Sequence, residues 1–352
     1  MNSIGGAQNL LLKFRRHRAV LHPRTLSFLF HWLRRSPTVP YPPLKLHLEP
    51  TSHCNLRCIM CPQSMGATKG NGYMDLELYR KIIDEARKFV LEINLFFRGE
   101  PLLHPKILEM VQIARSAGIS VHINTNATLL RGKIIDGLLT AGLNKLTISF
   151  DAGEKEGSER MRRGASFEKT LENTISFLKA KAASRSRLPY TTIQVIRFFE
   201  PGATRPVVPP DFVRLFDGLP VDEFDPIWAH GWAGTMKNSE SFQAAPYGHN
   251  YYPCNWLWKS LAICWDGKVA TCCGDFGPME VFGDLKSESL AEIWNGPHMV
   301  RIRTLQRNGK LDQLPLCRGC DAPWQPDGLR WKLFDLSSRL IGITYRGDRQ
   351  PT

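Results

Sequence analysis

Between residues 44 and 228, short apolar runs alternate with amphipathic segments, and this alternation limits the possible folds more than any other feature. Strands are expected at 44–48, 93–97, 121–124, 146–150, 191–198 and 224–228, with helices at 76–90, after 105, near 134–141, at 167–181 and at 211–216. Asp75 and Ser166 directly precede two of these helices and are expected to cap them. Six strand–helix units with short connections predict an α/β fold with a parallel sheet, curved into a barrel or doubly wound.

Nine cysteines form two groups along the chain. Cys54, Cys58 and Cys61 follow the first strand with the spacing C-x3-C-x2-C, and the other six are Cys254, Cys264, Cys272, Cys273, Cys317 and Cys320. This number and clustering favour metal ligands in a reducing compartment over the disulfides of a small secreted protein. Three thiolates within eight residues can hold three irons of a cubane cluster and leave the fourth without a protein ligand. A redox or zinc loop and buried free thiols are the alternatives.

Polar residues stand at the ends of the next three strands. They are Arg98-Gly99-Glu100-Pro101, then Asn124 and Asn126, then Ser149 and Asp151, and Arg162 follows a little later. Parallel strands bring their C-terminal ends to one edge of a sheet, where ligands bind. Taken singly, Glu100 could cap a helix, Asn126 could shape a turn and Arg162 could be a surface charge. Their common place behind one cysteine loop favours a shared site.

The cysteine loop and these strand ends together resemble the radical S-adenosylmethionine (radical SAM) superfamily. The resemblance implies a partial (β/α)6 TIM-like barrel, in which Cys54, Cys58 and Cys61 hold a [4Fe-4S] cluster that chelates S-adenosylmethionine. It implies cofactor contacts from Arg98, Gly99, Glu100, Pro101, Asn124, Asn126, Ser149 and Arg162. Glu100-Pro101 is similar to the end of the Gly-Gly-Glu-Pro motif that holds the methionyl amino group, although Arg98 replaces its first glycine. Arg162 is similar to the arginine that reaches the cofactor carboxylate.

The region 250–325 is similar to the SPASM and twitch extensions of the same superfamily, a small cysteine-rich hairpin-plus-helix domain. Residues 261–271 predict the hairpin, with positive φ at Asp266 and Gly267, and residues 289–306 predict one helix. By this resemblance, Cys254, Cys272, Cys317 and Cys320 are the four ligands of a single auxiliary [4Fe-4S] cluster. Four thiolates would also bind structural zinc. Cys264 and Cys273 are left over, and we expect them to be small buried side chains.

Both ends of the chain lie outside the resemblance, which divides it into an extension 1–43, a barrel 44–235, the auxiliary domain 250–325 and an amphipathic tail 326–352. The chain has a formal net charge of +13, and eight basic residues but no acidic ones precede Glu49. The rest is only mildly basic, so we expect no nucleic-acid partner. The basic extension fits a transit peptide, a helix on an anionic membrane surface, or an arm packed on the main domain. We expect a cytoplasmic protein, with possible peripheral membrane contact.

The resemblance implies that S-adenosylmethionine is cleaved to a 5′-deoxyadenosyl radical, which takes hydrogen from a substrate. A fully ligated auxiliary cluster suits electron acceptance, so the sequence favours oxidation of a small sugar- or cyclitol-like molecule, with Asp151 as a base. Peptide maturation is the runner-up, and radical epimerisation with Cys264 or Cys273 as hydrogen donor is a third option. A non-catalytic electron carrier or zinc-stapled binding module is the alternative of another class. A flavodoxin or ferredoxin is the expected reductant.

Overall fold

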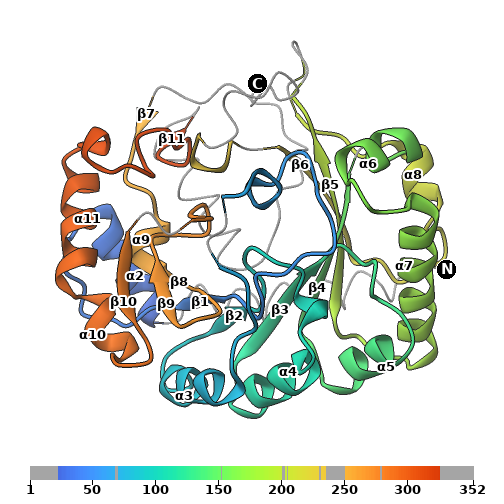
Figure 1. Cartoon of the computed structure of the whole chain (residues 1–352), viewed down its shortest axis with the longest axis horizontal. Coiled ribbons are helices and arrows are strands. Elements are labelled where there is room, and N and C mark those ends of the chain that lie inside the picture. Colours follow the sequence, from blue (N-terminus) through green and yellow to red (C-terminus); the bar gives the residue numbers. More distant parts are fainter. Residues whose placement is uncertain are drawn as a thin grey trace.

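The computed structural model describes residues 23–325, except 68–69, 152, 200–202, 204, 230, 235–249 and 278–279. Its centre is a nine-stranded sheet in the order β10-β9-β8-β1-β2-β3-β4-β5-β6 (Figure 1). Neighbouring strands from β1 to β6 are parallel. These six strands are β1 (Lys45–Leu48), β2 (Glu92–Asn94), β3 (Ser120–Thr125), β4 (Lys145–Asp151), β5 (Tyr190–Arg197) and β6 (Glu223–Trp228). The predicted α/β fold with six parallel strands is confirmed, and β6 is an open edge of the sheet in the described part of the chain.

The helices between these strands cover the outer face of the curved sheet (Figure 1). They are α3 (Leu76–Ala86), α4 (Ile107–Ser116), α5 (Lys133–Thr140), α6 (Lys155–Met161), α7 (Phe167–Ala183) and α8 (Pro210–Arg214). Asp75 caps α3, because its side chain accepts from the amides of Glu77 and Leu78 at 2.8 and 3.3 Å. Ser166 caps α7 by accepting from the Lys169 amide at 3.4 Å. Both predicted caps are therefore confirmed.

Four predicted features differ from the structure. Helix α3 ends at Ala86, before the predicted residue 90. The Ala86 carbonyl accepts from the amides of Phe89 and Val90, which forms a tight turn. The strand that follows, β2, is shorter than predicted. The predicted helix 289–306 is two helices, α10 (Leu290–Trp294) and α11 (Pro297–Arg307). They are separate because Pro297 has no amide hydrogen to continue α10 and instead begins α11. At the predicted hairpin turn, Gly267 alone has a positive φ, +91°.

The hairpin of the C-terminal region extends the barrel sheet. It consists of β8 (Ser260–Ile263) and β9 (Lys268–Ala270), and β10 (Val281–Asp284) follows. Strand β8 runs parallel to β1, with Lys45 beside Ser260 and Leu48 beside Ile263. The two cysteine-bearing regions therefore share one sheet. A separate two-stranded sheet pairs β7 (Asn250–Tyr251) with β11 (Trp324–Gln325). Helix α9 (Trp256–Lys259) follows β7 in the sequence and precedes β8.

The segment 23–43 packs on this C-terminal region. Helix α2 (Pro23–Leu33) buries Phe28 and Trp32 completely, and lies behind α9 and α11 in Figure 1. The Trp32 indole donates to the Pro253 carbonyl at 3.0 Å, and the Trp258 indole donates to the Ser36 carbonyl at 2.8 Å. This part of the basic extension is therefore an integral part of the core. Residues 1–22 and the predicted tail 326–352 lie outside the described residues, and no described helix is long and apolar enough to cross a membrane.

Candidate radical and auxiliary cluster sites

The first cysteine loop leaves the end of β1 and is held by backbone hydrogen bonds from two sides. The His53 carbonyl accepts from the Glu100 amide at 2.8 Å, which ties the loop to the segment after β2. On the other side, the Arg57 amide donates to the Arg163 carbonyl at 2.8 Å, and the Ile59 amide donates to the Met161 carbonyl at 2.9 Å. The loop is therefore anchored between the ends of β2 and α6.

The thiols of Cys54, Cys58 and Cys61 lie close enough to influence one another. Burial raises the pKa of Cys58 to about 12, Arg162 opposes this rise, and Cys61 and Cys54 add to it. Three soft thiols with a nearby guanidinium fit an iron–sulfur cluster, whose binding would displace their protons. In a cubane cluster each thiolate binds a different iron. The sulfur atoms therefore lie farther apart than ligands that share one metal ion. Among the described residues, no three His, Cys, Asp or Glu side chains are arranged to hold a single metal ion.

Gly99 has a steric reason to be glycine. A Cβ atom built on it would lie 2.2 Å from the Thr51 carbonyl oxygen and 2.5 Å from the His53 carbonyl oxygen. Any side chain would therefore push β2 away from the start of the cysteine loop. Pro101 begins a short 3₁₀ helix, η2 (Pro101–Leu103), immediately after Glu100.

Glu100 is buried and joins this segment to the end of β3. Its Oε1 atom accepts from the Leu102 amide at 3.1 Å and from the Thr125 hydroxyl at 2.7 Å. Its Oε2 atom accepts from the Asn126 amide at 2.8 Å. Burial raises the pKa of Glu100, and these hydrogen bonds oppose the rise. Glu100 thus caps η2, as its plainer role requires, and its carboxyl group lies next to the cysteine loop.

Asn126 connects the end of β3 to the cysteine loop directly. Its Nδ2 atom donates to Asn55 Oδ1 at 3.0 Å, and Asn55 in turn donates to the Thr128 hydroxyl at 2.8 Å. On the neighbouring strands, the Ser149 hydroxyl donates to Asn124 Oδ1 at 2.8 Å. The structure therefore brings Asn124, Asn126 and Ser149 to the same edge of the sheet as the cysteine loop.

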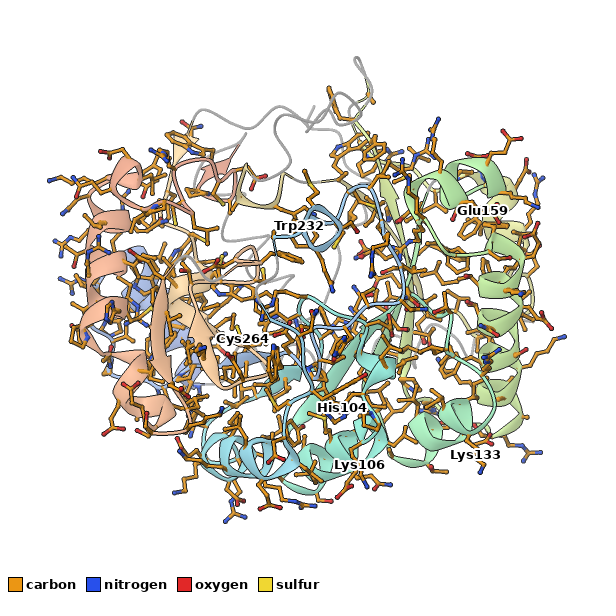
Figure 2. The ribbon with its side chains drawn as sticks, viewed as in Figure 1. His104, Lys106, Lys133, Glu159, Trp232 and Cys264 are labelled. Carbon is orange, nitrogen blue, oxygen red and sulfur yellow. The ribbon has the colours of Figure 1, made fainter. Side chains whose placement is uncertain are left out.

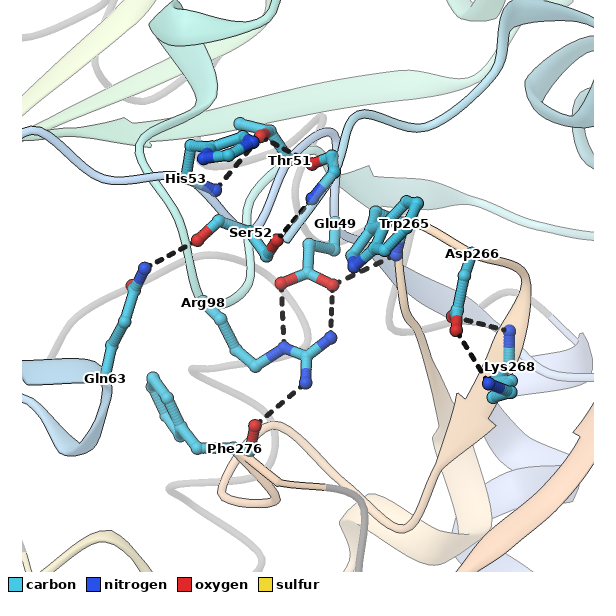
Figure 3. A network of polar contacts seen from close by, with 11 residues as sticks. Glu49, Thr51, Ser52, His53, Gln63, Arg98, Trp265, Asp266, Lys268 and Phe276 are labelled. Carbon is cyan, nitrogen blue, oxygen red and sulfur yellow. Dashed lines mark hydrogen bonds and ion pairs between the residues drawn. The ribbon is translucent and has the colours of Figure 1, made fainter. Parts of the chain in front are cut away.

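Arg98 points toward the C-terminal region. Its Nε atom donates to Glu49 Oε1 at 2.7 Å, its Nη2 atom pairs with Glu49 Oε2, and its Nη1 atom donates to the Phe276 carbonyl at 2.8 Å (Figure 3). The Trp265 amide also donates to Glu49 Oε2, at 3.0 Å. Each of the three guanidinium nitrogens thus takes part in joining the segments after β1 and β2 to the auxiliary region. Sequence reasoning missed Glu49, Trp265 and Phe276, and the arginine in place of a glycine was the available signal.

Asp151 and Arg162 form a buried ion pair, with Arg162 Nε 2.5 Å from Asp151 Oδ2. Asp151 has 0% of its surface exposed and Arg162 has 8%. Burial raises the pKa of Asp151, and Arg162 opposes the rise. Arg162 also lowers the pKa of Cys58, so its charge is felt at the cysteine loop. The two predicted residues therefore lie together beside that loop, and neither is open to solvent.

The thiols predicted for the auxiliary cluster also converge, around Cys254. Burial raises the pKa of Cys317 to about 12, and Cys254 adds to the rise. Cys254 acts in the same direction on the pKa of Cys320 and of Cys272, for which burial is again the largest cause. The Gly274 amide donates to Cys272 Sγ at 3.4 Å. The four thiols come from three separate segments and lie near enough to influence one another's pKa, which is compatible with a cluster that has four protein ligands.

The two remaining cysteines occupy different surroundings. Cys264 follows β8, is 1% exposed, and packs with Ala262 and Ala270 against Phe97 and Trp256 (Figure 2). Cys273 lies next to Cys272, and its pKa is raised to about 12 by burial and then by Cys254. Burial likewise raises the pKa of Cys264 to about 12. Both thiols therefore stay protonated near neutral pH.

The interior of the sheet carries a chain of polar side chains that sequence reasoning missed. Asn94 lies between two histidines, with Nδ2 3.2 Å from His47 Nδ1 and Oδ1 3.2 Å from His122 Nδ1. His122 Nε2 lies 2.8 Å from the Thr147 hydroxyl. Burial is the main cause that lowers the pKa of both histidines, so both are neutral near pH 7. A closed TIM barrel fills this space with apolar side chains, so a polar interior is a distinguishing feature of this open sheet.

Comparison with known domains identifies both cysteine regions. A model described as the radical SAM superfamily matches residues 48–184, and the SPASM model, described as an iron–sulfur cluster-binding domain, matches residues 254–321. The first match contains Cys54, Cys58 and Cys61, and the second contains the other six cysteines.

Several curated proteins are similar in sequence. A tungsten-containing aldehyde ferredoxin oxidoreductase cofactor-modifying protein of Pyrococcus furiosus is 38% identical over 108 residues, which is 30% of either chain. An AdoMet-dependent heme synthase of Methanosarcina barkeri is 31% identical over 38% of either chain. The chain therefore aligns with less than two fifths of these two relatives. A PqqA peptide cyclase of Xanthomonas oryzae pv. oryzae is 28% identical over 89% of this chain and 90% of its own.

Solved structures show the same fold. The crystal structure of BtrN in complex with AdoMet and 2-DOIA superimposes with a TM-score of 0.55 and 19% identity, over 79% of this chain and 92% of BtrN. Streptococcus suis SuiB bound to its precursor peptide SuiA superimposes with a TM-score of 0.62 and 14% identity, over 87% of this chain and 79% of SuiB. The domain matches confirm the expected cofactors, [4Fe-4S] clusters and S-adenosylmethionine. Residues 48–184 therefore form a domain of the radical SAM superfamily, and residues 254–321 form a C-terminal SPASM iron–sulfur cluster-binding domain.

Proposed function

We propose that this protein oxidises a small polar molecule, such as a sugar or cyclitol, by removing two electrons from a carbon that bears a hydroxyl group. When bound, S-adenosylmethionine and the two clusters supply a hydrogen-abstracting 5′-deoxyadenosyl radical and an acceptor for the electron that the substrate radical gives up. Cys54, Cys58 and Cys61 hold the first cluster in this proposal, and Glu100, Asn126 and Arg162 bind the cofactor around it.

The observation that carries the proposal is the convergence of four auxiliary thiols. Cys272, Cys317 and Cys320 each have a pKa raised by burial and then by neighbours that include Cys254. A cluster with four protein ligands has no open iron, so it is suited to accepting an electron rather than to binding substrate. An acceptor of this kind supports a net oxidation.

The polar lining of the sheet supports a polar substrate. At the open edge, Gln194 Nε2 donates to Asp225 Oδ2 at 2.9 Å. Deeper inside lie the neutral imidazoles of His47 and His122 and the amide of Asn94, which can accept or donate hydrogen bonds to hydroxyl groups. A sugar-like molecule could exchange its hydrogen bonds with water for bonds to these groups, whereas an apolar molecule could not.

Oxidation of an alcohol also requires a group that accepts the hydroxyl proton. We assign this role to Asp151, whose pKa is raised by burial. The carboxylate is paired with Arg162 at 2.5 Å, so it becomes available when Arg162 turns to the carboxylate of the cofactor. In this scheme Asp151 can accept the proton only after the cofactor has bound and Arg162 has turned away.

Replacing both Cys317 and Cys320 with alanine tests the proposed oxidation. The first cysteine loop stays intact in this variant, so cofactor cleavage should persist, while formation of a ketone product should fall below detection. Deuterium placed on the reacting carbon should still move into 5′-deoxyadenosine. Cys273→Ala is the matched control and should retain product formation. Ketone formation at the normal rate without the auxiliary thiols would contradict the proposal.

A second candidate is peptide maturation. PqqA peptide cyclases from two Xanthomonas species align with 80% to 89% of this chain, at 25% to 28% identity. A crosslinked or epimerised peptide as the product would favour this function. For epimerisation, the protonated thiols of Cys264 and Cys273 are candidate hydrogen donors, and the product would keep its oxidation state and gain one solvent deuterium.

The first cluster needs an electron donor, and we propose a flavodoxin- or ferredoxin-like protein for this role. Arg57 and Arg163 are exposed and joined by a backbone hydrogen bond at the cysteine loop. An acidic electron carrier would be attracted to such a pair and brought close to the cluster.

A further inference from the structure

The turn after β6 lies between the two cysteine regions. It is formed by Trp232–Gly234, and Figure 2 labels Trp232 beside the blue cysteine loop. The Trp232 indole nitrogen donates to the Met60 carbonyl at 2.8 Å. Met60 stands between Cys58 and Cys61, so this bond holds the loop between two predicted cluster ligands.

The same indole contacts the auxiliary region. Its ring meets Phe276 edge to face, with centroids 5.0 Å apart and planes at 78°. Phe276 is 4% exposed and follows Cys272 and Cys273 by a few residues, and its carbonyl accepts from Arg98. Trp232 thus bridges the two regions through one side chain, with a hydrogen bond on one side and an aromatic contact on the other.

The next two residues of the turn reach two more cysteine-bearing segments. A Cβ built on Gly274, directly after Cys273, would lie 3.4 Å from the Ala233 Cβ. A Cβ built on Gly319, between Cys317 and Cys320, would lie 3.1 Å from the Ala233 carbonyl oxygen and 3.3 Å from Gly234 Cα. A side chain at position 319 would be tight and one at position 274 would be in ordinary contact, so the turn packs closely against both auxiliary segments.

The backbone of the turn is in an uncommon conformation. Trp232 has φ of 45° and Ala233 has φ of 55°, both in the left-handed region that residues with a side chain seldom adopt. Such conformations persist only where the surrounding contacts determine them. The contacts with Met60, Phe276, Gly274 and Gly319 are among those that hold the turn in this conformation.

We infer that Trp232 is a positioning residue that couples the two cluster sites. It fixes the first cysteine loop and the Cys272 segment relative to each other. Each site therefore retains its cluster better when the turn is intact. This inference rests on the proposal of two clusters but not on any substrate. It goes beyond the reaction itself, because neither domain match extends over Trp232.

The test uses the full chain in three forms: wild type, a form with Cys54, Cys58 and Cys61 replaced by alanine, and a form with Cys317 and Cys320 replaced by alanine. Each form carries Trp232, Trp232→Phe or Trp232→Ala. Iron per chain is measured after anaerobic reconstitution and again after a fixed exposure to chelator. The spectrum of the reduced cluster is recorded with and without S-adenosylmethionine.

We expect Trp232→Ala to lose iron to the chelator at least about threefold faster in both single-site forms, and to weaken the spectral change on cofactor addition. Trp232→Phe keeps the aromatic contact but loses the hydrogen bond to Met60. It should therefore retain iron at the auxiliary site like the wild type and lose iron faster at the first site only. Trp324→Ala is the control, because Trp324 contacts Tyr251 and lies in the same C-terminal region.

Three outcomes would overturn the inference. The first is wild-type iron retention and an unchanged cofactor response in Trp232→Ala. The second is an equal loss of iron in Trp324→Ala. The third is a matching fall in the melting temperature of the iron-free Trp232→Ala protein, which would indicate general destabilisation. Zinc or no metal at the auxiliary site of the wild type would instead refute the proposed function, so the two failures are distinguishable.

Discussion

At the residue scale, Glu100 shows how one side chain serves both structure and chemistry. It caps η2 and accepts from the Thr125 hydroxyl and the Asn126 amide, and it places a carboxyl group beside the cysteine loop. These roles follow from one fact, that β2 and β3 end at the same edge of the sheet. The plain and the functional interpretations of this residue are therefore not exclusive.

Glu100→Gln should weaken S-adenosylmethionine binding about tenfold or more, since a hydrogen bond to a charged group contributes roughly 1.5–3 kcal/mol. Glutamine keeps the size and one acceptor of the side chain, so the fold should be retained. Calorimetric titration of the reconstituted protein with the cofactor measures the effect. The exposed Glu109 lies on α4, away from the loop, and Glu109→Gln is the control. Unchanged affinity with the first cluster intact would mean that Glu100 does not bind the cofactor.

At the scale of elements, the ion pair between Glu49 and Arg98 joins β1 and β2 to the segment that follows Cys273. Both side chains are almost completely buried, with 0% and 2% of their side-chain surface exposed. Four contacts meet there, and two of them come from the auxiliary region through the Trp265 amide and the Phe276 carbonyl. Arg98, which replaces the first glycine of the family motif, therefore helps to hold these segments together.

Arg98→Met should lower the free energy of unfolding by about 3–5 kcal/mol, because it leaves the carboxylate of Glu49 buried without its partner. The double variant Glu49→Leu with Arg98→Met should recover part of this loss, since it removes both charges. Urea unfolding of the iron-free protein measures both. We also expect Arg98→Met to lose iron from the auxiliary site before the first site. A single variant as stable as the wild type would show that this pair does not hold the two regions together.

At the scale of the whole molecule, the N-terminal segment of the described chain packs against its C-terminal region. Segment 23–43 lies against α9 and α11, where Arg303 donates to the carbonyls of Leu257 and Pro37 at 2.9 and 3.2 Å. Asn295 donates to the Val39 carbonyl at 2.8 Å. The N-terminal segment of the described chain and the auxiliary region are thereby packed into one unit.

One deletion and one substitution separate the structural and the surface roles of the basic extension. Removing residues 1–22 should leave the unfolding midpoint unchanged but reduce sedimentation with anionic liposomes, because each basic residue near such a surface contributes about 1 kcal/mol. Trp32→Ala in the full chain should instead lower the free energy of unfolding by about 3–5 kcal/mol and leave sedimentation unchanged. Neutral liposomes are the control. Equal pelleting of the two chain lengths would reject the membrane contact.

The sequence by itself determined the parts that depend on local pattern. The apolar runs and the caps Asp75 and Ser166 predicted the parallel strands and most of the helices, because side-chain periodicity and capping act within a few residues. The cysteine spacing and the motif order carried the resemblance to both cluster domains.

Only the tertiary structure decided which distant groups meet. The pairing of β8 with β1 and the pairing of Asp151 with Arg162 are not contained in any local pattern. Neither is the bridge from Trp232 to Met60, which joins residues 172 positions apart. Sheet pairing and the burial of charge depend on the whole chain packing at once, so they become visible only when the fold is complete.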